Sequence, residues 1–166
     1  MHGLGNDFVI IDRRSKNIEI SKKLINTLSD RKSGAGCDQL ITIDPSTAND
    51  HDVSIQIYNP NGDRAEACGN GTRCIAKLLF DENNKEEIKI KSDAGILLAK
   101  KIDYKNISVN LGKLSHNWQD IPTTIKVDTL NVPIKIDGFS SGVAVSIGNP
   151  HIIFFGANIE NVDLSS

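Results

Sequence analysis

Short runs in which apolar and polar residues alternate occur along most of the chain, and they predict strands. Residues 7–12 form an apolar, β-branched run, and residues 52–59 alternate between the two kinds. The pattern returns in residues 86–92, 95–102 and 107–111, which tight polar turns separate. Because such alternation buries one face of a strand, these last three segments are expected to form a β-meander.

Further strands are predicted before and after this region. A glycine-rich turn leads into a strand over residues 34–43, and a polar loop is expected over residues 44–52. Nearer the C-terminus, residues 132–138, 142–148 and 151–156 are expected as strands.

Two segments carry the 3.6-residue period of a helix instead. Residues 21–31 place leucine and isoleucine on one face behind Ser21, a candidate N-cap, and predict a short surface helix. Residues 70–84 predict a helix that starts near residue 69 and is apolar on several sides. That distribution favours a helix wrapped by a sheet. The expected fold class is therefore α+β, with a mostly antiparallel sheet.

Residues 112–123 break this rhythm with glycine, tryptophan and proline, and we interpret them as a linker. We expect residues 1–113 to form an N-terminal domain. Residues 114–166 are expected to hold the linker and the first strands of a second, incomplete domain. A chain of 166 residues is long enough for one core and part of another.

Composition narrows the function classes. Hydrophobic residues make up 39% of the chain and charged residues 24%, which is ordinary for a globular protein. The net charge of −2 without a basic patch argues against nucleic acid as a partner, and the apolar runs are too short for a membrane span. With three cysteines and no secretory signal pattern, a cytoplasmic location is expected.

Candidate chemistry concentrates in AEACGNGTRC, residues 65–74, where the second predicted helix begins. A helix N-terminus has unpaired N–H groups and partial positive charge, so it can bind a carboxylate and make a nearby thiol easier to ionise. Cys68 at that end would suit removal of a proton next to a carboxylate. A lone cysteine near glycine is more often structural, and this stretch by itself leaves both interpretations open.

The other two cysteines are interpreted as structural. Cys74 lies six residues further along the helix, which turns it about 240° around the axis and makes it a small core residue. Cys37 lies where a loop enters a strand, and packing is favoured there over catalysis. The spacing suits neither a disulfide between Cys68 and Cys74 nor a metal site.

Four stretches, in this order and spacing, resemble the diaminopimelate epimerase family: MHGLGNDFVIID (1–12), GAGCDQLI (34–41), NPNGDRAEACGNGTRC (59–74) and GNPHIIFF (148–155). The resemblance implies two similar domains, each a sheet wrapped round a central helix, with an amino-acid substrate in the cleft between them. It also implies an epimerase without a cofactor, which interconverts LL- and meso-diaminopimelate in lysine and cell-wall biosynthesis. Two cysteines would act on opposite faces of the α-carbon, one as thiolate and one as thiol.

The resemblance also assigns roles to residues of this chain. Cys68 would be the first acid/base, and Gly69 and Asn70 would offer backbone N–H groups to the α-carboxylate. His151 would lie near the substrate amine and tune thiol ionisation. Amide side chains can donate to a carboxylate and accept from an ammonium group. Those implied as substrate contacts are Asn6, Gln39, Asn59 and Asn149. Asp7 lies in the first stretch, but no chemical role is assigned to it.

The family's second cysteine, with a helix mouth of its own, has no match in these 166 residues. We therefore expect the N-terminal portion of an epimerase, able at most to exchange the α-proton without inversion. The alternative is an inactive or self-associating half-site module. In that case two copies would pair their Cys68 helix mouths as a homodimer.

Overall fold

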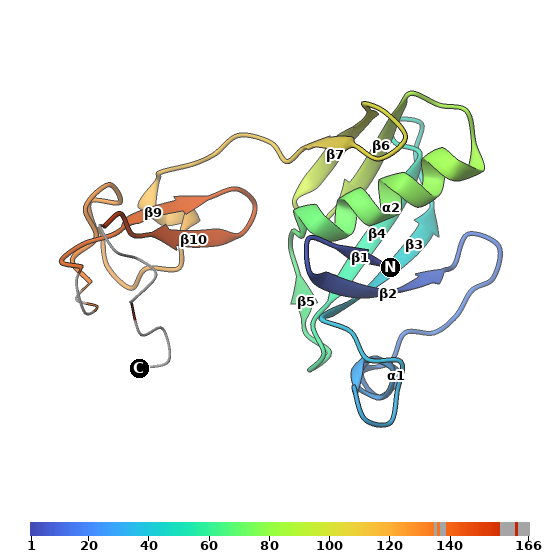
Figure 1. Ribbon diagram of the computed structural model, residues 1–166, viewed down its shortest axis with the longest axis horizontal. Helices are drawn as coiled ribbons and strands as arrows, with labels where there is room; N and C mark the ends of the chain where they lie inside the picture. The colour runs from blue at the N-terminus through green and yellow to red at the C-terminus, as the bar shows by residue number, and fades with distance from the viewer. Residues whose placement is uncertain (135, 137–138, 157–161, 163–166) are drawn as a thin grey trace. The chain divides into compact units, whose positions relative to one another are not determined.

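Two units make up the chain in the computed structural model, Met1–Leu111 and Gly112–Ser166 (Figure 1). The structure describes residues 1–134, 136, 139–156 and 162. The division predicted from the sequence lies after residue 113. Each unit has its own core and is described by itself.

The N-terminal unit is built on one eight-stranded mixed sheet in the order β1-β2-β3-β4-β6-β7-β8, with β5 paired to β4. Its strands are β1 (His2–Gly3), β2 (Asn6–Asp12), β3 (Gln39–Pro45), β4 (Val53–Tyr58), β5 (Arg64–Ala65), β6 (Glu87–Ser92), β7 (Gly95–Lys101) and β8 (Ile107–Asn110). Strands β2 and β3 are parallel, as are β4 and β6, and the other pairs are antiparallel. The predicted α+β class with a mostly antiparallel sheet is confirmed.

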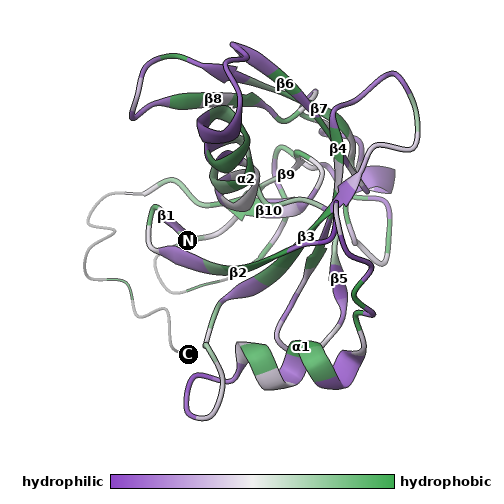
Figure 2. Cartoon of the chain, turned by 90° about the vertical axis from the view of Figure 1, so that its right-hand side faces the viewer, coloured by the Kyte–Doolittle hydropathy of each residue, from purple (hydrophilic) through white to green (hydrophobic). Residues whose placement is uncertain are grey.

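Helix α2 (Gly69–Glu82) lies inside the curl of this sheet. In Figure 2, β2 and β3 lie on one side of the helix and β6, β7 and β8 on the other. Ile75 and Ala76 of α2 are completely buried and share one core cluster with Ile41, Ile57 and Ile90 of the sheet. The helix is apolar on several sides because strands surround it, and the predicted wrapped helix is confirmed.

Helix α1 (Lys22–Ser29) covers the opposite face of the sheet. Its N-cap is Ser21, as predicted, and the hydroxyl oxygen accepts a hydrogen bond from the N–H of Leu24 at 3.2 Å. Ile25 is buried in a second cluster with Leu40 of β3 and Tyr58 of β4. Both faces of the central strands are therefore covered, which explains why they are so rich in isoleucine and leucine.

The C-terminal unit contains a 3₁₀ turn (Trp118–Asp120) and a hairpin of β9 (Val143–Ser146) and β10 (Pro150–Ile153). Residues 112–123, interpreted from the sequence as a linker, contribute two contacts within this unit. Ile121 is buried in a cluster with Val132 and Ala144. Ser115 forms a β-bridge with Ser146.

The predicted strand over residues 132–138 falls partly outside the described residues, at 135 and 137–138. Its described positions form only isolated bridges, from Val132 to Gly142 and from Ile136 to Phe139. No helix in the described part of the chain is long and apolar enough to cross a membrane.

Candidate active site

Strand directions bring three of the predicted substrate contacts to one end of the sheet. The parallel strands β2 and β3 begin at Asn6 and Gln39, and β4, antiparallel to β3, ends one residue before Asn59. The amide nitrogen Nε2 of Gln39 donates to Oδ1 of Asn59 at 3.1 Å. Residues 20 positions apart in sequence are thus in direct contact.

Cys68 reaches the same end of the sheet through β5. Ala65 pairs with Ile57 near the end of β4, and three residues later Cys68 is the N-cap of α2. Its extended backbone lets its carbonyl accept the first helical hydrogen bond, from the N–H of Thr72 at 2.9 Å. Its Sγ accepts the N–H of Gly71 at 3.3 Å. The thiol, which is half-buried, is held at the mouth of the helix.

The two residues after Cys68 offer their backbone at this mouth. The N–H groups of Gly69 and Asn70 precede the first helical hydrogen bond, so they have no acceptor within the helix. Together with the positive end of the helix dipole they form an arrangement that favours an anion. A Cβ on Gly69 would lie 3.1 Å from Cδ1 of Leu111, so the absent side chain also gives room to the chain leaving β8.

Gly71 has a different reason to be glycine. A Cβ there would lie 2.6 Å from Cδ1 of Ile41 and 3.4 Å from Cε1 of Phe8, and both neighbours belong to the core. The absence of a side chain at Gly71 therefore lets the start of α2 pack against the sheet.

The mouth of α2 is joined directly to the start of β2. Nδ2 of Asn70 donates to Oδ1 of Asn6 at 2.7 Å, and Arg73 donates to Oδ1 of Asn70. Gly3 of β1 packs against the first turns of α2. A Cβ on Gly3 would lie 3.3 Å from the carbonyl oxygen of Asn70 and 3.3 Å from Sγ of Cys74. The structure therefore brings Asn6 and Asn70 into contact beside Cys68.

Three charged residues that were given no role lie next to these amides. Arg31 donates to the carboxylates of both Asp7 and Asp38, and Asp38 accepts Nδ2 of Asn6 at 3.2 Å. The hydrogen bond from Arg31 holds the pKa of Asp7 well below its usual range. Asp7 and Asp38 both lie in the stretches on which the family resemblance rests, whereas nothing in the sequence pattern marks Arg31.

The other two cysteines are buried, as the sequence analysis predicted. Cys37 is 2% exposed and its thiol donates to the hydroxyl of Ser29 at 3.4 Å. Cys74 is 5% exposed, and burial raises its pKa. Both thiols are therefore shielded from solvent, whereas Cys68 is partly open to it.

Asn149 and His151, the predicted site residues of the C-terminal unit, contact each other. Nε2 of His151 and Oδ1 of Asn149 lie 3.1 Å apart at the turn between β9 and β10. The turn contains Gly148 with a φ of 88°, a conformation that favours glycine. The participation of these two residues in the site stays a prediction.

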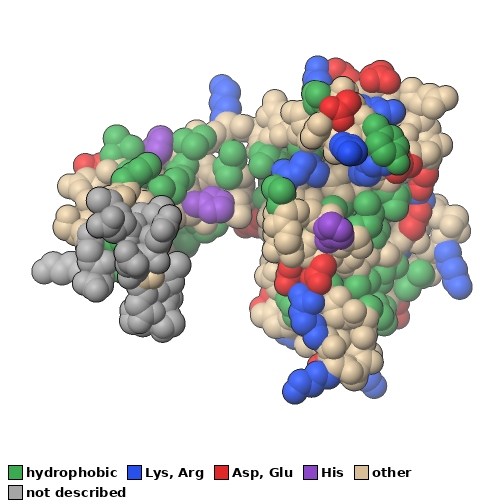
Figure 3. Space-filling model, in the orientation of Figure 1, with side chains coloured by type: hydrophobic (Ala, Val, Ile, Leu, Met, Phe, Trp, Pro, Cys, Tyr) green, Lys and Arg blue, Asp and Glu red, His purple; other side chains and the backbone are tan. Residues whose placement is uncertain are grey.

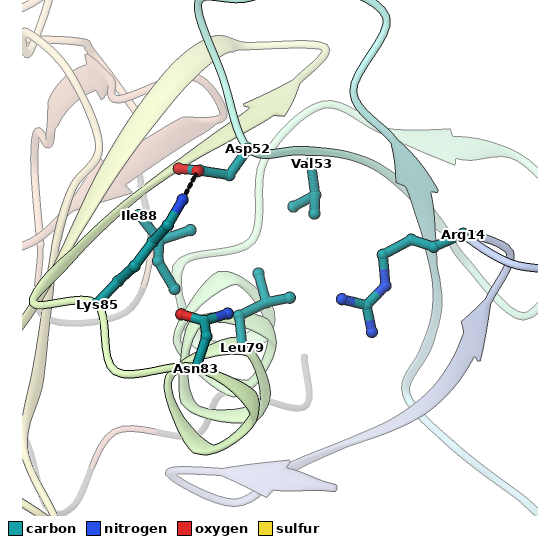
Figure 4. A pocket seen from close by; sticks show the side chains of 7 residues that line it. All are labelled: Arg14, Asp52, Val53, Leu79, Asn83, Lys85 and Ile88. Atoms are coloured by element: carbon teal, nitrogen blue, oxygen red, sulfur yellow. Dashed lines mark hydrogen bonds and ion pairs between the residues drawn. The ribbon is translucent and has the colours of Figure 1, made fainter.

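A separate pocket of about 190 Å³ lies at the other end of α2 (Figure 4). Leu79 and Ile88 line its apolar part, and Asp52 pairs with Lys85 at its edge. Arg14 reaches it but is already hydrogen-bonded to Asp12 and Glu82. Helix α2 has 14 residues, so this pocket is about 20 Å from the Cys68 mouth and does not belong to it.

Comparison with known proteins gives a family for this arrangement. Residues 1–117 match the family model of diaminopimelate epimerase. Proteins of that name from Sphingopyxis alaskensis and Pelagibacter ubique are 42% and 41% identical to 99% and 100% of this chain. The chain spans 58% and 61% of the length of these curated relatives.

Solved structures agree in fold. A predicted epimerase from Pseudomonas aeruginosa has a TM-score of 0.63 at 11% identity, over 93% of this chain and 55% of that one. A hydroxyproline epimerase from Agrobacterium vitis, with bound trans-4-hydroxy-L-proline, has a TM-score of 0.58 at 14% identity, over 79% of this chain and 38% of that one. Identities this low show a shared fold and nothing more. The family is shown by the family model and by the relatives at 42% and 41% identity. The chain belongs to the diaminopimelate epimerase family.

Proposed function

We propose that this chain performs the proton transfer of a diaminopimelate epimerase, with Cys68 as one of two acid/base groups. The main support is one observation: a half-buried thiol caps α2 beside two N–H groups that have no acceptor in the helix. A carboxylate bound to those N–H groups would bring its α-carbon close to the sulfur. The substrate class is therefore an amino acid, and the family points to LL-diaminopimelate.

In the proposed step, the thiolate of Cys68 removes the α-proton and becomes a thiol. The electron pair of the broken C–H bond moves into the carboxylate. The N–H groups of Gly69 and Asn70 would face the charge that develops on the carboxylate oxygens and stabilise it. Return of a proton from the thiol to the carbon restores both the thiolate and the amino acid.

The amide side chains would orient the substrate. Asn6, Gln39 and Asn59 lie at the same end of the sheet as the helix mouth, and Asn6 already contacts Asn70. Amides can bind a carboxylate and an ammonium group without adding net charge. We propose that Asn149 and His151 complete the substrate contacts from the C-terminal unit.

Inversion of the α-carbon needs a proton donor on the face opposite Cys68. The remaining cysteines of these 166 residues, Cys37 and Cys74, are buried and 5% exposed at most. By itself the chain is therefore proposed to exchange the α-proton with solvent and to retain configuration. We place the reaction in the cytoplasm, on a route to lysine and the cell wall. Three free thiols suit a reducing compartment.

Incubation of the 166-residue chain with LL-diaminopimelate in D₂O tests this function. Proton NMR follows loss of the α-proton signal, and chiral chromatography follows the meso product. We expect exchange by the native chain without the meso product. Cys68→Ser keeps an acceptor at the N-cap but lacks the thiol, so exchange should slow about 100-fold or more.

Cys37→Ala serves as the matched control, because it removes a buried thiol whose hydrogen bond goes to Ser29 of α1 and not to a residue of the helix mouth. It should keep the native exchange rate. Undiminished exchange by Cys68→Ser would exclude Cys68 as the base, and a native chain without exchange would exclude the function for this chain. Rapid formation of the meso product would contradict action on a single face.

A further inference from the structure

We propose that Arg31 is a positioning residue for the substrate-binding amides. By pairing with Asp7 and Asp38 it fixes the starts of β2 and β3, and so holds Asn6 and Gln39 at the mouth of α2. The inference rests on the proposed function, since those two amides are predicted substrate contacts. It assigns a purpose to the charged cluster that the proposed reaction leaves unused.

The guanidinium of Arg31 makes a fork between the two carboxylates. Nη1 and Nη2 each donate to Asp7 at 2.8 Å, and Nη2 also donates to Oδ1 of Asp38 at 2.7 Å. Gly36 packs on the arginine, because a Cβ there would lie 3.1 Å from its Cα and Cγ. Both the head and the stem of Arg31 are thereby held in place.

The two aspartates also bind each other's backbone. The N–H of Asp38 donates to Oδ1 of Asp7 at 2.8 Å, and the N–H of Asp7 donates to Oδ2 of Asp38 at 3.0 Å. These reciprocal bonds join residues 31 positions apart and set the register between the first residues of β2 and β3. Asn6 and Gln39 are the immediate neighbours of Asp7 and Asp38.

Asp38 determines which way the amide of Asn6 turns. Its Oδ2 accepts Nδ2 of Asn6 at 3.2 Å, and an ionised carboxylate can only accept hydrogen bonds. Nδ2 must therefore face Asp38, which leaves Oδ1 of Asn6 to accept from Asn70 at 2.7 Å. The carboxylate of Asp38 fixes the amide of Asn6 at the helix mouth, and its hydrogen bond from Arg31 holds that carboxylate in place.

Without Arg31, two carboxylates would face each other beside the site proposed for the substrate's α-carboxylate. Their mutual repulsion would separate the strand starts, and their combined charge would oppose the substrate carboxylate. Lysine cannot replace the fork, because an ammonium group is a point charge without bidentate geometry.

An ordinary surface ion pair would not have this effect. Figure 3 shows acidic and basic side chains next to each other at several places on the N-terminal unit. Such exposed pairs contribute little to stability. Arg31, Asp7 and Asp38 are similarly accessible, at 56%, 39% and 40% of their side-chain surface. We expect the loss of Arg31 to act mainly on the geometry of the amides and to change the free energy of unfolding only slightly.

The test compares Arg31→Gln with Arg14→Gln. Arg14 also bridges two carboxylates, those of Asp12 and Glu82, but it lies at the far end of α2 and so is the matched control. The side-chain amide resonances of Asn6 and Gln39 are recorded in the free ¹⁵N-labelled chain. KM and kcat for LL-diaminopimelate are measured by α-proton exchange in D₂O.

We expect Arg31→Gln to shift both amide resonances. It should also raise KM about tenfold with little change in kcat, because the charge-assisted hydrogen bonds that position the substrate-binding amides are lost. Arg31→Lys should behave like Arg31→Gln, and Arg14→Gln like the native chain. Native resonances and KM in Arg31→Gln, or the same changes in Arg14→Gln, would overturn the proposal. A native chain without exchange would refute the proposed function, while the resonances would still decide whether Arg31 positions the amides.

Discussion

Replacement of Gly71 by alanine tests how closely the start of α2 is packed against the sheet. The added Cβ would lie 2.6 Å from Cδ1 of Ile41, closer than side-chain carbons approach in folded proteins. Ile41 is completely buried, so its methyl group cannot simply turn into solvent. The helix start and the strand must therefore move apart unless that methyl group is removed.

Two opposing effects set the magnitude. Alanine is favoured over glycine within a helix by about 1 kcal/mol, whereas overpacking of a core costs about 1–3 kcal/mol. We expect Gly71→Ala to destabilise the N-terminal unit by about 1 kcal/mol, and Ile41→Val to do so by a similar amount. Valine lacks Cδ1, so the double variant should return to about native stability, which gives a coupling of about 2 kcal/mol.

Urea unfolding followed by circular dichroism at 222 nm measures this cycle, since the signal comes largely from α1 and α2 of the N-terminal unit. Fluorescence of Trp118 would report the C-terminal unit instead. A double variant whose loss equals the sum of the single losses would refute the packing argument. Stabilisation by Gly71→Ala alone would do the same, because it would mean that the site is open.

Two further predictions concern ionisable groups. Iodoacetamide should label the native chain once, at Cys68, because Cys37 and Cys74 are buried. Mass spectrometry should find one label on the native chain and three on the chain in denaturant. Rapid labelling of a second cysteine in the native chain would contradict this burial. The pKa of Asp7 is lowered by Arg31, so its carboxylate stabilises the fold above the unfolded pKa of 3.8 and loses this effect as pH falls toward the folded value. The difference in Tm between the native chain and Asp7→Asn should therefore shrink between pH 7 and pH 3, and a constant difference would contradict the assignment.

The hydrophobic pattern predicted helices and strands well where a segment was long enough to show a period. The wrapped helix α2 and the strands β4, β6 and β7 all showed six or more patterned residues. β1 and β5 have two residues each and carry no period, so they were missed. The parallel pairing of β2 with β3 was also not evident, because alternation shows which face is buried but not which strand is the neighbour.

Local motifs revealed part of the site, and tertiary structure provided the rest. Cys68, Gly69 and Asn70 stand together in the sequence, so a helix signal beside them was enough to suggest a carboxylate site. Arg31 gave no such signal, because its partners Asp7 and Asp38 lie 24 and 7 positions away. In the sequence alone, Arg31 resembles any solvent-exposed arginine. Its contacts with Asp7 and Asp38 exist only once the starts of β2 and β3 lie side by side in the fold.

The choice of cysteine at residue 68 is not explained by helix stability. Serine, threonine, aspartate and asparagine are the preferred N-caps, because an oxygen is a stronger hydrogen-bond acceptor than sulfur. Here Sγ accepts the N–H of Gly71 at 3.3 Å, a contact that a hydroxyl or carboxylate oxygen would make more strongly. The position therefore has a weaker cap than its geometry allows. A helix start that has this weaker cap, and that keeps a half-buried thiol beside N–H groups without an acceptor in the helix, is better suited to chemistry than to capping.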